Sequence, residues 1–578
     1  MKKLFTILTT LALLCVVGCE EQGDDNVNPN DKPNTEQPGE KPDDGDDSSD
    51  TDVPYCDQIQ YISTDGCIVI PHDTSAFGVD ILSNTYEDDK GIITFNGNIT
   101  SIGDNAFQGC ASLTGITIPD SVTEIGKQAF DECSSLTSIT IPDSVTEIGE
   151  WAFYGCTSLT SITIPDSVTE IGDYAFEGCT SLTSVTIGNG VTSIRESAFS
   201  GCTGELIINS KLVETNYTYS NYPSNYGWLK GAKFSKLTIG DSVTSIGNYA
   251  FWDCTSLTSV TIPDSVTEIG DSAFRYCTSL TSITIGNGVT SIGSCAFSGC
   301  SSLTSVTIPD GVTSIEYGTF GGCTSLKSIY GKYTSNDGRC LIIGGTLNSF
   351  APAGLTEYTI PDSVTMIGHY AFYYCTSLTS ITIPDSVTEI WSSAFDSCSS
   401  LTTVTIPDSV TSIEESAFSG CTSLKSIYGK YASNDGRCLI IDGVLNSFAP
   451  AGLTEYTIPD SVTSIGYGVF AYCSSLTSIT IPDSVTSIGV AAFSGCTSLA
   501  SVTIGNGVTY IGGYAFYGCT SLTSVYCKAT TPPSGYGDMF DDNASGRKIY
   551  VPRASVDAYK AAEGWSEYAE YIEPYQFE

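Results

Sequence analysis

The segment LTSITIPDSVTEIGDYAFEGC, residues 159–179, recurs along the chain with a period of 23 residues. The last cysteine of this unit marks the period in four runs, and a 52-residue step separates successive runs. A fixed period in the twenties is typical of a solenoid, in which each repeat forms one coil and packs against its neighbours. The cysteines at this position are Cys110, Cys133, Cys156, Cys179, Cys202, Cys254, Cys277, Cys300, Cys323, Cys375, Cys398, Cys421, Cys473, Cys496 and Cys519.

The apolar residues of one unit predict a short strand followed by a turn. Ile162 and Ile164 belong to the L-x-x-L-x-L spacing of a leucine-rich repeat strand. Because side chains alternate along a strand, we expect these two to be buried and the Ser and Thr between them to face outward. Pro165 ends the strand, since proline donates no hydrogen bond to a ladder. Segment 172–178 then turns the chain back, and Phe176 fills the core.

Each 52-residue step contains one ordinary coil and one longer, 29-residue coil. Two long coils are near copies, GKYTSNDGRCLIIGGTLNSFAPAG from Gly331 and GKYASNDGRCLIIDGVLNSFAPAG from Gly429. In the second copy, Asp442-Gly443 lies between apolar runs and predicts a two-residue hairpin turn. The third long coil, within 203–236, breaks the leucine register near Glu205. We therefore predict a β-rich solenoid, a leucine-rich repeat array of about 18 coils with a 23-residue period and three 29-residue coils.

The N-terminal region predicts an exported and anchored protein. Residues 1–18 have the lysines and the apolar run of a signal peptide. Val16-Val17-Gly18-Cys19 resembles a bacterial lipobox, which implies that Cys19 is lipidated and anchors the chain to a membrane; a plain cleaved signal peptide is the alternative. Residues 19–54 are rich in Asp, Asn, Pro and Gly and predict a disordered acidic tether.

The remaining boundaries follow from where the repeat spacing begins and ends. Residues 55–95 have alternating apolar runs without the repeat and predict an N-terminal cap. Residues 96–526 predict the solenoid itself. Residues 527–578 have helical spacing and predict a C-terminal cap that covers the last coil.

The repeat unit IPDSVTEIGxxAFxGCTSLTSIT resembles the BspA-like leucine-rich repeat of bacterial surface proteins, over roughly residues 90–526. The resemblance implies a solenoid that adheres to host matrix proteins or to other cells. The acidic cluster directly after Cys19 resembles the export signal of surface-exposed lipoproteins in gut and oral anaerobic bacteria. Together these resemblances imply an outer membrane lipoprotein that is exposed on the cell surface.

Fifteen of the 23 cysteines share one repeat position. Equivalent neighbours above and below argue against pairing, and cysteine packs well as a small apolar residue. We therefore predict a buried ladder of free thiols, with disulfides between adjacent coils as the alternative. Cys56 and Cys67 lie outside the array and are the better candidates for a disulfide.

Composition and motifs argue against catalysis, a cofactor or nucleic acid. The net charge of −42 disfavours nucleic acid as a partner and keeps a β-rich chain soluble. The chain has two histidines, no recurring C-x-x-C pair and no known catalytic motif. Of the histidines, His72 and His369, the second occupies a variable repeat position where we expect an exposed side chain. We predict that the chain is not an enzyme and has no metal site.

An acidic residue or Asn follows the first strand in most repeats, as at Asp166 and Asn189. Turn formation explains both residues, because each bonds its own backbone. A second interpretation is a ladder of carboxylates that binds Ca²⁺. A third interpretation is O-glycosylation, since Asp120-Ser121-Val122 resembles the three-residue glycosylation signal of such bacteria.

Uniform Ser and Thr on the strands would bind weakly, so we expect selectivity where the chain departs from the repeat. The third long coil contains a cluster of aromatic residues in polar sequence, which suits protein or sugar contacts. We predict adhesion to a host or bacterial surface protein, with glycan capture for nutrient uptake or a non-binding spacer as alternatives. The candidate ligand-binding residues are Tyr217, Tyr219, Tyr222, Tyr226 and Trp228.

Overall fold

The computed structural model describes residues 57–214, 229 and 231–577, all within the unit Pro54–Glu578. The predicted signal peptide, Cys19, the tether and Cys56 lie outside the described residues. So do the five candidate binding residues of the third long coil.

Each ordinary coil has a longer first strand, a second strand of two residues and a turn segment. In the unit quoted above, the first strand is β9 (Ser161–Ile164) and the second is β10 (Glu170–Ile171). Ile162 and Ile164 are buried between exposed Ser161 and Thr163, which confirms the predicted alternation. Phe176 in the turn segment is fully buried, as predicted.

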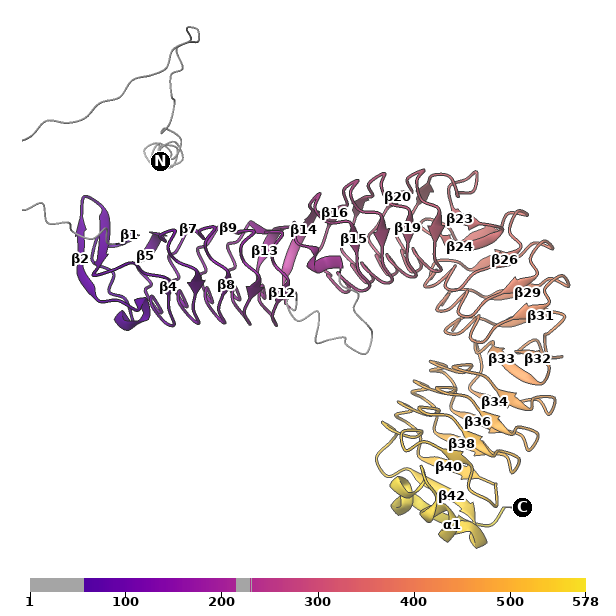
Figure 1. Ribbon diagram of the computed structural model, residues 1–578. Helices are drawn as coiled ribbons and strands as arrows, with labels where there is room; N and C mark the ends of the chain where they lie inside the picture. Colours follow the sequence, from indigo (N-terminus) through magenta and orange to yellow (C-terminus); the bar gives the residue numbers. More distant parts are fainter. Residues whose placement is uncertain (1–56, 215–228, 230, 578) are drawn as a thin grey trace, which may run out of the picture. The chain divides into compact units, whose positions relative to one another are not determined.

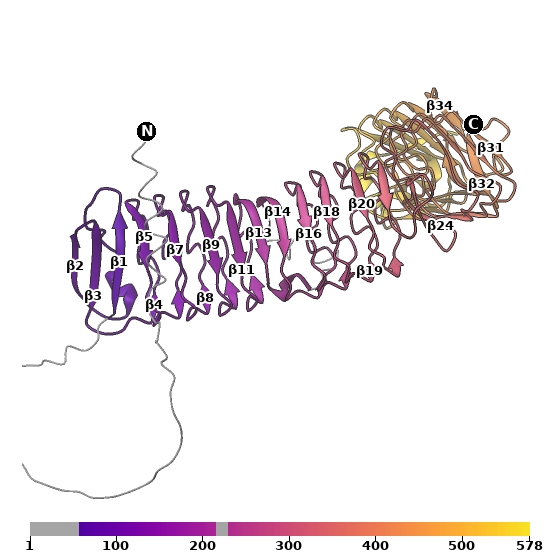
Figure 2. The same ribbon diagram turned by 90° about the horizontal axis from the view of Figure 1, so that it is seen from above.

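Successive coils stack with their strands parallel and in register. Ser161 of β9 pairs with Ser184 of the next first strand, and Glu147 pairs with Glu170 in the second ladder. Figure 2 shows the first strands of neighbouring coils side by side from β5 to β20. The predicted solenoid with a 23-residue period is confirmed.

The first strands are β5 (Leu113–Thr117), β7 (Ser138–Thr140), β9, β11 (Ser184–Ile187), β13 (Thr203–Ile208), β14 (Lys233–Ile239), β16 (Ser259–Thr261), β18 (Ser282–Thr284), β20 (Ser305–Thr307), β22 (Ser328–Tyr330), β25 (Glu357–Thr359), β27 (Ser380–Thr382), β29 (Thr403–Ile406), β31 (Ser426–Gly429), β34 (Glu455–Thr457), β36 (Ser478–Ile481), β38 (Ser501–Ile504), β40 (Ser524–Cys527), β42 (Lys548–Pro552) and β43 (Ile572–Tyr575). The second strands are β4 (Ser101–Ile102), β6 (Glu124–Ile125), β8 (Glu147–Ile148), β10, β12 (Ser193–Ile194), β15 (Ser245–Ile246), β17 (Glu268–Ile269), β19 (Ser291–Ile292), β21 (Ser314–Ile315), β26 (Met366–Ile367), β28 (Glu389–Ile390), β30 (Ser412–Ile413), β35 (Ser464–Ile465), β37 (Ser487–Ile488), β39 (Tyr510–Ile511) and β41 (Ser534–Gly535).

Two long coils carry the predicted hairpins (Figure 1). In the first, β23 (Cys340–Ile343) pairs antiparallel with β24 (Thr346–Phe350); in the second, β32 (Cys438–Ile441) pairs with β33 (Val444–Phe448). Asp442 and Gly443 both adopt positive φ angles, as a tight hairpin turn requires.

The third long coil does not have the predicted 29-residue length. Glu205 pairs with Ser184 of the preceding first strand and with Lys236 of the following one. The first of these spacings is shorter than the 23-residue period, and the second is longer than a 29-residue coil. The pairing also shifts by one residue between Gly204 and Glu205. The register break predicted near Glu205 is therefore confirmed, but the predicted coil lengths are wrong because the chain shortens one coil before lengthening the next.

The two ends are built differently. At the N-terminal end, β1 (Gln58–Ser63), β2 (Ile81–Glu87) and β3 (Lys90–Phe95) form antiparallel pairs, and a 3₁₀ helix η1 (Thr74–Phe77) precedes β2. At the C-terminal end, β42 and β43 extend the parallel ladder beyond residue 526. The helical spacing there corresponds to one short helix, α1 (Val556–Ala561), between the 3₁₀ helices η5 (Arg553–Ser555) and η6 (Ser566–Tyr571).

The core is a column of stacked apolar residues in which the phenylalanines lie ring on ring. Phe176 is 5.0 Å from Phe153 and 5.3 Å from Phe199 between ring centroids, with planes within 5° of parallel. The ladder cysteines from Cys133 on are mostly buried, and the thiol of Cys179 donates to the carbonyl of Phe153 in the preceding coil at 3.1 Å. The predicted burial is confirmed, and this bond explains why a thiol suits the position.

The buried apolar residues fall into three clusters, and both boundaries lie at the hairpin coils. Polar side chains bridge the first boundary: the amide of Asn348 donates to the carbonyl of Glu316 at 2.8 Å, and Ser349 Oγ accepts the N–H of Phe320 at 3.1 Å. Asn446 occupies the equivalent place at the second boundary. The hairpin coils therefore interrupt the apolar column while satisfying the backbone on either side.

Candidate binding surfaces

The turn segments of neighbouring ordinary coils form a shared surface, which we call the turn face (residues 172–178 and their equivalents). Two residues per ordinary coil adopt left-handed backbone angles, as at Trp151 (φ 55°) and Gly155 (φ 67°). The N–H groups of Trp151 and Phe153 donate to the carbonyls of Asp173 and Ala175 in the next coil at 2.9 and 2.7 Å. Because these bonds repeat from coil to coil, side chains at equivalent positions stack in columns.

Aromatic side chains gather on the turn face. We define the C-terminal patch as Tyr467, Tyr472, Tyr514, Tyr517 and Tyr536, whose side chains are between 39% and 64% exposed. The ring of Tyr472 lies against Gly495 of the next coil, and the rings of Tyr514 and Tyr517 meet edge to face at 5.6 Å. A hydrogen bond to the Asp542 carboxylate raises the pKa of Tyr517. The patch is an ordered aromatic surface bordered by acidic residues.

A second aromatic cluster on the turn face includes one of the two histidines. Tyr317 contacts His369 and Trp391 edge to face, at 5.1 and 5.2 Å between centroids. His369 Nδ1 is 3.7 Å from a carboxylate oxygen of Glu414, and its side chain is 31% exposed. The prediction of a plain exposed histidine is therefore wrong, because neighbouring rings cover much of it.

The strand face, formed by exposed side chains such as Ser161 and Thr163, is mainly hydroxylated. The threonine before many first strands uses its hydroxyl within the fold: Thr160 Oγ1 donates to the carbonyl of Thr137 at 3.2 Å. Tyr330 and Tyr428, beside the hairpin coils, interrupt this surface with side chains 54% and 53% exposed.

The two hairpin coils contain matching polar networks that are satisfied internally. In the first, the hydroxyl of Tyr358 donates to Asp337 Oδ2 at 3.0 Å and lies 3.2 Å from the thiol of Cys340. Burial raises the pKa of Cys340 to about 12 and the pKa of Tyr358 above its ordinary value. Arg339 donates to two carbonyls of its own coil at 2.9 Å. These groups stabilise the hairpin rather than offering free ligand contacts.

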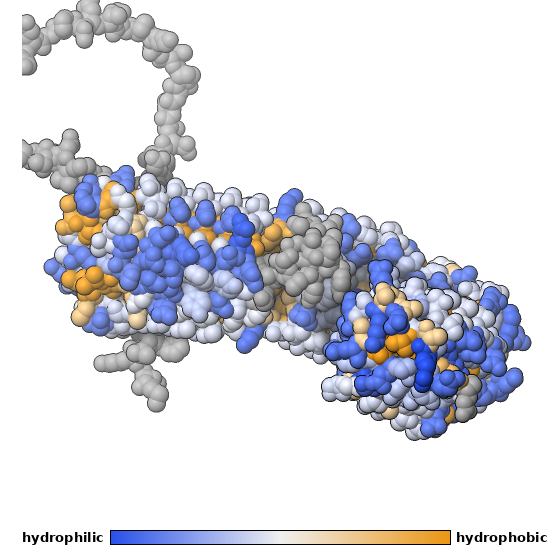
Figure 3. Space-filling view, turned by 90° about the horizontal axis from the view of Figure 1, so that it is seen from below, coloured by the Kyte–Doolittle hydropathy of each residue, from blue (hydrophilic) through white to orange (hydrophobic). Residues whose placement is uncertain are grey.

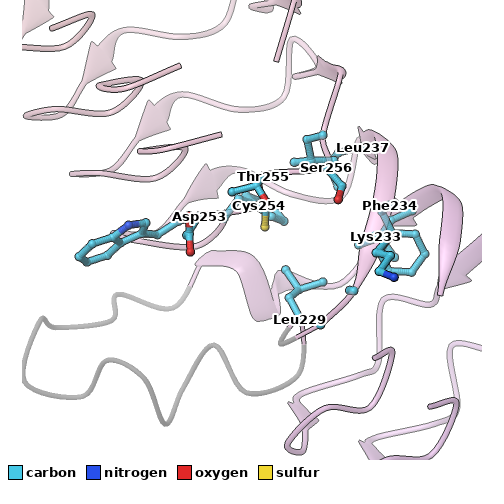
Figure 4. Close-up of a pocket in the computed structure, with 14 residues that line it drawn as sticks. Leu229, Lys233, Phe234, Leu237, Asp253, Cys254, Thr255 and Ser256 are labelled. Carbon is cyan, nitrogen blue, oxygen red and sulfur yellow. The ribbon is translucent and has the colours of Figure 1, made fainter. Parts of the chain in front are cut away.

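An apolar cavity of about 450 Å³ lies at the third long coil (Figure 4). The coil lacks the phenylalanine of ordinary units, so Phe234 approaches Phe199 only to 6.1 Å and at a steep angle. Leu206, Leu229 and Phe251 line the space, together with the half-buried Cys254. The missing Ala-Phe pair was the sequence signal that could have predicted this cavity.

Exposed aliphatic side chains also gather at the N-terminal end, where Figure 3 shows hydrophobic surface. Ile62, Ile68, Ile70 and Leu82 are between 40% and 74% exposed. Cys67, predicted as a disulfide candidate, is exposed beside them, while its proposed partner lies outside the described residues.

The acidic turns after the first strands act in coil packing. Asp166 Oδ1 accepts the N–H of Asn189 at 2.8 Å, and the same bond joins Asp264 to Asn287. In an Asp-Ser-Val turn, Ser144 Oγ donates to the carbonyl of Val122 at 2.6 Å. These bonds join neighbouring coils, so the bond of Asp and Asn to their own backbone stays a prediction. Across the described ranges, no group of three or more His, Cys, Asp or Glu side chains is arranged to hold a metal ion.

No helix in the described part of the chain has the length and apolarity that crossing a membrane requires.

Comparison with known proteins agrees with the repeat geometry. The BspA type leucine-rich repeat region model matches residues 84–217, 224–336, 346–434 and 445–555. No curated protein is significantly similar to the chain.

Similar solved structures include a leucine-rich repeat protein from Bacteroides ovatus, 26% identical, covering 82% of this chain and 91% of that chain with a TM-score of 0.30. A leucine rich cell surface protein from Faecalibacterium prausnitzii is 24% identical and covers 84% and 98%, with a TM-score of 0.29. The pneumococcal vaccine antigen PcpA is 18% identical and covers 80% and 94%, with a TM-score of 0.32. Since the family model matches most of its residues, the chain belongs to the BspA-type leucine-rich repeat family.

Proposed function

We propose that the chain is a cell-surface lipoprotein whose solenoid binds a macromolecule through its turn face, and that it serves adhesion to a host matrix or cell-surface protein or to other cells. The observation that carries this proposal is the C-terminal patch of five exposed tyrosines. Tyrosine is enriched at protein interfaces because it combines a large apolar ring with a hydrogen-bonding hydroxyl.

The test compares Tyr→Ser substitutions on the two faces. The turn-face variant combines Tyr472→Ser, Tyr514→Ser and Tyr536→Ser; the control combines Tyr330→Ser and Tyr428→Ser on the strand face, where the exposure is similar. Serine already occupies the left-handed positions of Tyr472 and Tyr514 in other coils, as Ser397 and Ser272, so we expect both proteins to fold.

Both variants and the unmodified chain are applied to arrays of extracellular-matrix proteins and of polysaccharides. We expect the turn-face variant to lose at least tenfold in affinity for a matrix protein, which is about 1.4 kcal/mol, and the control to stay within twofold. Loss in the control alone would assign binding to the strand face. Absence of binding by the unmodified chain would favour a structural spacer.

Glycan capture is the second candidate, because aromatic side chains also line the strand face at its C-terminal end. Tyr526 stacks on Tyr550 at 4.9 Å, and Tyr575 contacts Tyr526 edge to face at 5.2 Å. Polysaccharide binding that is lost in Tyr550→Ala, or in Tyr222→Ala and Trp228→Ala of the third long coil, would support this candidate over adhesion.

The lipid anchor is tested separately. Cells expressing the chain are labelled with an alkyne-tagged fatty acid, and we expect label on the unmodified chain and none on Cys19→Ala. Equal labelling of both would contradict anchoring at Cys19. Protease digestion of intact cells then reports whether the chain is exposed outside the cell.

A further inference from the structure

A pocket of about 430 Å³ opens on the turn face between three consecutive coils, far along the chain from the C-terminal patch. Its aromatic walls are Trp151, Tyr154 and Tyr174. Its polar lining consists of Gln128, Asp131, Glu132 and Glu177. The lining therefore combines aromatic rings with three carboxyl groups and includes no lysine or arginine.

The repeat itself brings these residues together. Gln128, Trp151 and Tyr174 are 23 residues apart and stack in one column of the turn face, at the first left-handed position. Asp131, Tyr154 and Glu177 form the adjacent column, also at steps of 23. The rings of Trp151 and Tyr174 are stacked at 5.9 Å. Residues that look unrelated in the sequence thus form one recess.

Asp131 is the feature that points to a ligand. Its side chain is only 7% exposed, and Oδ2 accepts hydrogen bonds from the amides of Gln108 and Gln128 at 2.8 and 3.0 Å. Oδ1 is buried and has no hydrogen-bond partner among the described residues. A buried carboxylate oxygen without a donor is unfavourable, so this atom favours a ligand that brings an N–H or O–H group.

Charge decides which donor fits. Glu132 and Glu177 add two carboxyl groups to that of Asp131. Lys127, the cation beside this lining, already forms an ion pair with Glu150 at 2.8 Å. Lys127 Nζ also lies 4.7 Å from the centroid of Trp151, which shows that this indole ring accepts a cation. The three carboxyl groups of the lining therefore favour a positively charged donor over a neutral one.

In another coil, the repeat positions of Asp131 and Glu132 hold a guanidinium group packed against an aromatic ring. Arg275 is equivalent to Asp131 and Tyr276 to Glu132, and the guanidinium of Arg275 lies 4.8 Å from the ring centroid of Tyr276. The turn face therefore accommodates a guanidinium against a tyrosine ring.

We propose that this pocket binds an organic cation, a guanidinium or alkylammonium group, and that a basic partner protein supplies it as an arginine or lysine side chain. Supply of the cation by a protein rests on the proposed function, because the cation then comes from an adhesion partner. Cation binding by the pocket does not depend on that function and extends to a free amine.

The test uses the full chain and two kinds of probe. A fluorescein-labelled Gly-Arg repeat peptide is compared by anisotropy with its citrulline counterpart, which has the same shape and no charge. Arginine methyl ester and tetramethylammonium chloride serve as free cations in competition. The variants are Asp131→Asn and Glu177→Gln, with Tyr154→Leu to remove an aromatic wall at nearly constant size.

A matched control is needed because a chain with net charge −42 attracts any basic peptide. Asp396 occupies the same repeat position as Asp131 in a distant coil, so Asp396→Asn removes the same charge from the same kind of turn. We expect the arginine peptide to bind at least tenfold more tightly than the citrulline peptide. We expect each pocket variant to weaken it at least fivefold, and Asp396→Asn to change it less than twofold.

Equal weakening by Asp131→Asn and Asp396→Asn would overturn the proposal, since binding would then follow net charge. Binding of a neutral oligosaccharide that is lost in Asp131→Asn would also overturn it in favour of a glycan site. Competition by arginine methyl ester together with failure of every matrix protein to bind would uphold the cation site while rejecting the proposed adhesion. Matrix-protein binding that the pocket variants leave unchanged, with no binding of the free cations, would reject the site and leave the proposed function standing.

Discussion

Replacing Phe176 with alanine should destabilise the N-terminal part of the solenoid by about 3–5 kcal/mol, the range for emptying a buried phenylalanine site. The ring is fully buried and stacks on Phe153 and Phe199 at 5.0 and 5.3 Å. Each such aromatic pair adds about 0.5–1.5 kcal/mol beyond its buried area. The N–H of Phe176 also bonds to the carbonyl of Ala198 at 2.7 Å, which fixes the spacing of the coils and hinders collapse of the cavity. We therefore expect the upper half of the range.

Phe234→Ala is the matched comparison. Its ring is buried too, but it lies 6.1 Å from Phe199 and lines a cavity that already exists. It should destabilise the protein by about 1 kcal/mol less than Phe176→Ala, since a favourable stacked pair is missing. Thr163→Ala on the exposed strand face should change stability by less than about 0.5 kcal/mol.

The assay combines urea unfolding with hydrogen exchange measured by mass spectrometry. Because the buried residues form three clusters separated at the hairpin coils, we expect faster exchange in the cluster that contains Phe176 and little change in the cluster of residues 438–572. A loss below about 1 kcal/mol for Phe176→Ala, or an equal loss for Phe234→Ala, would refute the reasoning. Uniformly faster exchange along the whole chain would contradict the separation of the clusters.

Three further predictions concern the backbone, a buried carboxyl group and the thiols. A Cβ at Gly190 would lie 1.9 Å from the carbonyl oxygen of Asp166, so Gly190→Ala should clearly lower the melting temperature. Gly115 has open space around it, so Gly115→Ala should leave the melting temperature unchanged or raise it slightly. Burial raises the pKa of Asp396 from 3.8 to about 6, so the protonated carboxyl group contributes its full stability below pH 3.8, and this stability is lost as the pH rises through 6. Asp396→Asn should therefore stabilise the protein at pH 7 by up to about 3 kcal/mol. In urea titrations at pH 4 to 7, the variant should lack the pH dependence of stability that Asp396 causes. Burial raises the pKa of Cys323 to about 12, so iodoacetamide at pH 9 should alkylate this thiol hundreds of times more slowly than the exposed thiol of Cys67. Peptide mass maps measure both rates. Similar rates for the two thiols would show that the cysteine ladder opens readily.

Much of the coil was predictable because each of its features has a local cause. The alternation around Ile162 follows from strand geometry, and the hairpin at Asp442-Gly443 follows from the positive φ angles that those residues tolerate. The register break near Glu205 was also predictable from the sequence. The sequence did not predict that one coil is shortened and the next is lengthened, because the shift at Gly204 depends on pairing between neighbouring strands.

The binding surfaces were harder to predict. Trp151 and Tyr174 adopt left-handed backbone angles although neither is glycine. The residue types alone therefore do not predict the turn that orients their side chains. The pocket depends on Asp131 being buried with one oxygen unpaired, which is a property of packing between coils. Stacking the repeats and comparing their variable turn positions would have revealed the aromatic columns. The aromatic cluster that the sequence favoured, Tyr217 to Trp228, lies outside the described residues, so its role stays a prediction.

Tyrosines of similar exposure on the two faces allow a direct test of which face binds. Hydroxyl-radical footprinting with mass spectrometry measures the oxidation of Tyr472, Tyr514 and Tyr536 on the turn face and of Tyr330 and Tyr428 on the strand face, all between 50% and 64% exposed. The measurement is made on the full chain alone and with a solubilised basement-membrane extract. We predict at least threefold protection of the turn-face tyrosines with no change on the strand face. Protection of Tyr330 and Tyr428 alone, or equal oxidation of all five with and without the extract, would contradict binding through the turn face.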